Sequence, residues 1–145
     1  MTATLLKRIA HHEAGHACAC IVYGVPLISV TVVDRPLVRR GRLRGGLGVE
    51  IVGTICFAGP ASEELFCGQP SPADRGDRID YEMAYAHLQR YVGPLRRGLE
   101  FERARDSARG LVRTSWARRV IPKLATALQT CGTLDGEQIN EVLLG

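Results

Sequence analysis

The sequence lacks paired cysteines, a long apolar run and a phosphate-binding loop of the G-x-x-x-x-G-K-[ST] type. Its five cysteines are odd in number and include no Cys-x-x-Cys pair, which argues against a disulfide framework and against a cysteine-ligated zinc site. The longest uncharged run, from Ala17 to Val33, contains Gly24 and Pro26 and is shorter than the ~20 residues that a membrane-spanning helix needs. No signal-peptide core precedes it. These absences predict a soluble, cytoplasmic protein without a membrane span.

Length and charge narrow the class further. The 145 residues suffice for one domain, residues 1–145, and a hydrophobic content of 46% allows a core. The net charge of +4 is small beside the concentrated basic faces of nucleic-acid-binding proteins, so a nucleic-acid partner is not expected. Five basic residues nevertheless gather in one segment, with no acid before Glu50: Arg35, Arg39, Arg40, Arg42 and Arg44. We interpret this segment as a solvated loop, with binding of phosphate or an acidic partner as the alternative.

Apolar periodicity predicts a mainly α chain with a small β element, in the α+β class. Helices are expected over 5–23, 51–66, 77–91, 95–120, 122–128 and 137–144; strands over 27–33 and 47–50; and loops over 34–48 and 68–76. Thr4 is the expected N-cap of the first helix, and either Thr133 or Asp135 caps the last. Pro60 is expected to kink or divide the second helix.

The chemistry begins with His12-Glu13-Ala14-Gly15-His16, an H-E-x-x-H sequence. Residues four apart project from the same side of a helix, so both imidazoles can reach one zinc ion. Glu13 lies beside that ion, where it can take a proton from a zinc-bound water as a general base. The alternative is a chance pair of buried histidines. It is disfavoured because the motif lies on the apolar face of a helix and because Gly15 costs a helix interior about 1 kcal/mol relative to alanine.

Four segments, in order along the chain, resemble the peptidase domain of the FtsH-type zinc metalloproteases. Ala10–Ala17 (AHHEAGHA) is similar to the family's H-E-A-G-H-A helix, and Ala58–Gly68 (AGPASEELFCG) to its A-G-R-x-A-E-E-L-x-x-G segment. Gly76–Ala84 (GDRIDYEMA) resembles G-A-S-N-D-I-x-x-A, and Thr133–Ile139 (TLDGEQI) resembles T-L-x-G-E-x-I. The resemblance covers the chain almost end to end, which is more specific than H-E-x-x-H alone.

The resemblance implies a zincin-like active-site helix within a helical-bundle peptidase domain that hydrolyses polypeptides. It makes Asp80 the third zinc ligand beside His12 and His16, with Asp77 as second choice. Two imidazoles and a carboxylate form a sensible zinc set that leaves a fourth position for water. The resemblance also suggests that Glu63 holds the ring of a zinc histidine, as outer partners do in such sites.

Departures from the family pattern keep other functions open. The chain has no ATPase motif, so a separate ATPase could deliver its substrate, and the family's arginine after A-G is Pro60 here. One alternative is therefore a catalytically silent, zinc-stabilised binding or regulatory protein. The other is a nucleic-acid binder that uses the arginine loop. We interpret His87 as an ordinary histidine, and we expect an extended substrate to add to the strand over 47–50.

Overall fold

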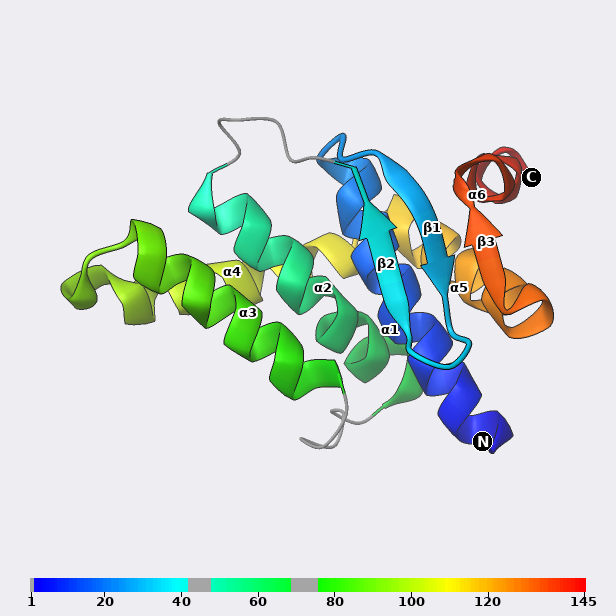
Figure 1. The fold of residues 1–145 in the computed structure, drawn as a ribbon, viewed down its shortest axis with the longest axis horizontal. Coiled ribbons are helices and arrows are strands. Elements are labelled where there is room, and N and C mark those ends of the chain that lie inside the picture. Colours follow the sequence, from blue (N-terminus) through cyan, green and yellow to red (C-terminus); the bar gives the residue numbers. More distant parts are fainter. Residues whose placement is uncertain (1, 42–47, 69–75) are drawn as a thin grey trace.

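The computed structural model describes residues 2–41, 48–68 and 76–145, with the backbone alone at residues 49 and 76–79 (Figure 1). The helices are α1 (Ala3–Val22), α2 (Val49–Cys67), α3 (Gly76–Tyr91), α4 (Pro94–Val112), α5 (Ser115–Cys131) and α6 (Gly136–Leu144). The strands are β1 (Leu27–Thr31), β2 (Leu37–Arg40) and β3 (Thr133–Asp135). The expected class, mainly α with a small β element, is confirmed.

The sheet is small and antiparallel, with strand order β2-β1-β3. Val30 of β1 lies opposite Val38 of β2 and Leu134 of β3. Chain segments about a hundred residues apart thus meet at β1, which ties the C-terminal part of the fold to the N-terminal hairpin. No helix in the described part of the chain is long and apolar enough to cross a membrane.

Helix α1 lies in the middle of the molecule and contacts α2, α5 and the first two strands (Figure 1). Its buried positions are mostly small: Ala10, Ala14, Ala17, Cys18, Ala19 and Cys20. Gly15 faces α2 so closely that a Cβ at this position would collide with the carbonyl oxygen of Ala58. Small residues therefore let α2 approach the helix that carries the H-E-x-x-H sequence.

The second strand lies at a different place from the prediction. β2 occupies Leu37–Arg40, inside the expected loop over 34–48, and pairs with β1 through a hairpin in which Asp34 adopts a positive φ of 57°. Asp is one of the few side chains that tolerate this conformation. The expected strand over 47–50 is wrong, because Gly48 is the N-cap of α2 and residues 49 and 50 are helical; residue 47 lies outside the described residues. Strand addition of a substrate at 47–50 is excluded for the same reason.

Helix boundaries in the C-terminal half also differ from the prediction. The expected helix over 95–120 is two helices, because the Thr114 side chain accepts a hydrogen bond from the Ala117 amide and caps α5. Pro122 lies inside α5 instead of starting a helix, and α2 likewise continues as one helix through Pro60. Proline removes one intrahelical hydrogen bond but leaves the tertiary packing of the helix intact. In α2 and α5 this packing keeps the helix continuous through the proline.

Side-chain hydrogen bonds identify the helix caps. Thr2, not Thr4, caps α1, because its hydroxyl accepts from the Leu5 amide at 3.1 Å. Asp135 caps α6 in a reciprocal arrangement with Gln138, while Thr133 belongs to β3. Most of the expected loop over 68–76 lies outside the described residues.

Candidate metal centre

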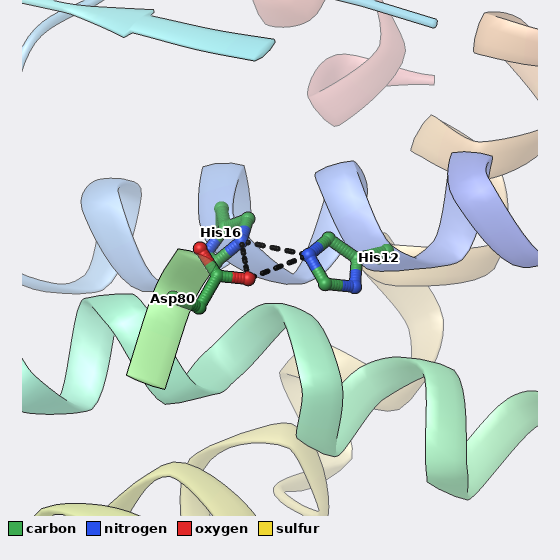
Figure 2. A group of neighbouring side chains, drawn as sticks. All are labelled: His12, His16 and Asp80. Carbon is green, nitrogen blue, oxygen red and sulfur yellow. Dashed lines mark hydrogen bonds and ion pairs between the residues drawn. The ribbon is translucent and has the colours of Figure 1, made fainter. Parts of the chain in front are cut away.

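Three side chains from two helices converge on one point (Figure 2). His12 and His16 come from successive turns of α1, and Asp80 comes from α3. Asp80 Oδ2 lies 2.8 Å from His12 Nε2 and 3.2 Å from His16 Nε2, and the two Nε2 atoms are 3.1 Å apart. The structure thus brings together the three residues that the sequence predicts as metal ligands.

In each histidine ring, Nδ1 makes a hydrogen bond away from the cluster, which leaves Nε2 facing it. His16 Nδ1 lies 2.8 Å from the backbone carbonyl oxygen of Ile55, and His12 Nδ1 lies 3.3 Å from Glu63 Oε2. Carbonyl and carboxylate oxygens only accept, so each Nδ1 carries a proton. In the neutral rings both Nε2 atoms therefore direct lone pairs at each other and at the Asp80 carboxylate.

Three acceptor atoms this close together are unfavourable unless a cation or a shared proton lies between them. Tetrahedral zinc, with bonds of about 2.0–2.1 Å, holds its ligand atoms about 3.3 Å apart, and the three separations of 2.8, 3.1 and 3.2 Å lie close to that value. Side-chain shifts of a few tenths of an ångström would suffice. Two imidazoles and one carboxylate suit zinc and also other divalent first-row metals.

The histidines and Asp80 each favour the charged form of the other. Burial raises the pKa of the Asp80 carboxyl, but His16 and His12 outweigh it and hold the pKa well below its ordinary value. Burial lowers the pKa of His16, but Asp80 outweighs it and raises the pKa above its ordinary value. Asp80 thus stays ionised beside rings that favour an added positive charge.

Glu63 lies behind the cluster on α2, with 1% of its surface exposed. It accepts the hydrogen bond from His12 Nδ1, and it also accepts one from Arg8 Nε at 3.0 Å. A carboxylate in this position sets the tautomer and the orientation of the His12 ring, and it makes Nε2 more basic. The contact matches the role that the resemblance suggests for this residue.

We expect Glu63→Gln to weaken zinc binding by about 10- to 100-fold, because the amide can hold the His12 ring less firmly than a carboxylate. Competition with a chromophoric chelator measures the affinity. The matched control is Glu64→Gln, since Glu64 is the neighbouring acid on α2 and lies outside the residues of the cluster. Equal losses in the two variants, or none in Glu63→Gln, would contradict the role of Glu63.

Gly59 is a site residue that the sequence reasoning missed. It lies on α2 directly against the cluster, where a Cβ would collide with His16 Nε2 and would lie 2.8 Å from His12 Nε2. Any larger residue would occupy the space between the ligand atoms. The signal was present in the sequence, because glycine in a helix interior costs about 1 kcal/mol relative to alanine and needs a reason.

A cavity of about 230 Å³ opens beside the cluster. Its walls come from α1, α2 and α3, and from the segment 35–40, which includes β2. Glu13 lines it with 7% of its surface exposed, and no side chain or backbone group in the described ranges hydrogen-bonds to its carboxylate. Burial raises the pKa of Glu13, and His16 and His12 partly oppose that effect.

Other predicted candidates lie elsewhere. His87 lies outside the cluster and contacts the Tyr91 ring, with 4.8 Å between ring centroids. The side chain of Asp77 is not described, so the choice of Asp80 rests on the position of Asp80 itself. Arg42 and Arg44 lie outside the described residues, whereas Arg35 and Arg40 line the cavity.

No protein-family model matches the chain, and no curated protein is similar to it. The resemblance to the FtsH-type enzymes therefore stays a prediction, carried by the segments that show it.

Proposed function

We propose that this protein is a zinc-dependent peptidase-like domain that hydrolyses polypeptides. The observation that carries the proposal is the convergence of three acceptor atoms, His12 Nε2, His16 Nε2 and Asp80 Oδ2, each within 3.2 Å of the others. A pair of histidines with a purely structural role would instead turn a ring N–H toward the Asp80 carboxylate. Here both donor nitrogens are used on the far side of the rings.

His12, His16 and Asp80 would hold the metal, and two further helices complete the site around α1. Ile55 and Glu63 of α2 orient the two rings, and α3 supplies the carboxylate. Bound zinc supplies Lewis acidity toward a carbonyl oxygen and lowers the pKa of water. The residues supply the rest of the chemistry.

Glu13 is the residue that we assign as general base. It precedes Ala14, Gly15 and His16 on α1, so it lies on the rim of the cluster and borders the cavity. Its carboxylate is free of other partners in the described structure, and its raised pKa brings it closer to that of an efficient base at neutral pH. It can take a proton from attacking water and pass that proton to the leaving amine.

The test is a cleavage assay that does not presuppose a sequence. A mixture of unstructured polypeptides is incubated with the protein, and mass spectrometry identifies new termini. Cleavage that stops with a chelator and returns with added zinc supports the proposal. A zinc-loaded protein that cleaves nothing in the mixture, but unfolds at a lower temperature once its zinc is removed, would favour the catalytically silent, zinc-stabilised protein.

A further inference from the structure

Arg40 is a charged residue of the cavity for which the proposed hydrolysis gives no use. It is the last residue of β2, where exposure alternates along the strand. Val38 and Arg40 are half-buried, whereas Leu37 and Arg39 are exposed. Alternate residues of a strand lie on the same face, so β2 turns Arg40 inward and Arg39 outward. Arg40 lines the same cavity as His12, Glu13, His16 and Asp80.

The guanidinium of Arg40 is incompletely satisfied. Its Nη1 is buried and, among the described residues, has no hydrogen-bond partner. Neither acid of the cavity provides one, because Asp80 is engaged by the two histidines and Glu13 forms no described ion pair. A buried donor on a charged group that is left unpaired is costly, so an anion in the cavity would stabilise it.

The surroundings locate the guanidinium along the cavity. Burial raises the pKa of the Cys20 and Cys56 thiols to about 11, and the Arg40 guanidinium nearby partly opposes this effect on both. Cys20 lies one turn after His16 on α1, about 6 Å further along the helix. The guanidinium and the cluster therefore border the same cavity.

We propose that Arg40 forms a carboxylate subsite in this cavity, so that substrates carry a carboxylate a short distance along the chain from the bond placed at the cluster. The position of that bond rests on the proposed function, whereas the subsite itself does not. A guanidinium matches a carboxylate through paired hydrogen bonds. The walls around it include apolar Pro36, Val38 and Met83, which favours a carboxylate attached to a peptide over a bare inorganic anion.

The carboxylate could be the C-terminus of a chain or the side chain of Asp or Glu. Nuclear magnetic resonance titration of the metal-free protein, kept in chelator, tests both. The probes are N-acetyl-alanine, which has a terminal carboxylate, the α-amide of N-acetyl-aspartic acid, which has only the side-chain carboxylate, and N-acetyl-alaninamide, which has neither. Because no metal is present, the titration reports on Arg40 and not on binding of the carboxylate to zinc.

We expect at least one carboxylate probe to shift the β2 amide resonances saturably and to bind about 10- to 100-fold more tightly than the amide. Arg40→Gln should remove this preference, Arg40→Lys should keep part of it, and the outward-facing control Arg39→Gln should keep all of it. Whichever carboxylate probe binds more tightly identifies the source.

Equal binding of acid and amide probes, no saturable shift with either acid, or equal losses in the Arg39 and Arg40 variants would overturn the subsite. Zinc content, measured separately on the same preparations, keeps the two proposals apart. A protein that binds carboxylate but no zinc retains the subsite and loses the hydrolase function. A protein that binds zinc but shows no preference for carboxylate does the reverse.

Discussion

Peptide hydrolysis should fall by about 10²- to 10⁴-fold in Glu13→Gln, with bound zinc unchanged. Glutamine has the shape of glutamate but cannot accept a proton at neutral pH, and Glu13 is not among the three converging ligands. The rate is measured on a peptide found by the cleavage assay, and zinc is measured by elemental analysis of the same sample.

The control for Glu13→Gln is Glu64→Gln, which neutralises an acid outside the cavity and should hydrolyse at the wild-type rate. Loss of zinc in Glu13→Gln would show that Glu13 acts on the metal or on the fold instead of on water. Unchanged hydrolysis with zinc retained would remove Glu13 from the mechanism.

Gly59→Ala should abolish stoichiometric zinc binding although it removes no ligand. The added methyl group would collide with His16 Nε2 and would lie 2.8 Å from His12 Nε2, so it occupies the space that the ion needs. Alanine also favours helix over glycine by about 1 kcal/mol, so α2 itself should form readily. Elemental analysis gives the zinc content, and circular dichroism reports whether the helices remain.

The matched control is Gly98→Ala in α4, where a Cβ meets no heavy atom within 4 Å. It should keep zinc and gain a little stability. Wild-type zinc content in Gly59→Ala, with the helices retained, would mean that the metal does not lie between the two imidazoles. If Gly59→Ala loses both zinc and helix, zinc is titrated into the partly folded variant. Zinc binding there would contradict the steric effect of the added methyl group.

The ligands on α1 could be predicted from the sequence because their geometry is local. Helical spacing alone puts His12 and His16 on one side of α1, and the surrounding apolar pattern identifies the helix. Asp80 could not be reached that way, since β1, β2 and α2 lie between the helix of His16 and its own helix in the sequence. Its assignment came from the resemblance, and the structure places its carboxylate at the cluster.

The features that the sequence did not predict depend on contacts between distant segments. The Arg-rich composition of 34–48 favours a loop, but pairing of Val38 with Val30 makes β2 a strand and turns Arg40 inward. The role of Gly59 depends on how closely α2 passes the two rings, which no single-helix pattern contains. Local pattern predicted most of the helical segments, whereas some of their boundaries and the residues that line the site depend on tertiary contacts.

X-ray absorption at the zinc edge, on protein purified with zinc and freed of excess metal, tests the metal centre most directly. We expect one zinc per chain, with two imidazole nitrogens and carboxylate or water oxygens at about 2.0–2.1 Å. His16→Ala should lose the metal. Sulfur at about 2.3 Å would point to the cysteines, and no zinc in protein refolded with the metal would contradict the centre formed by His12, His16 and Asp80.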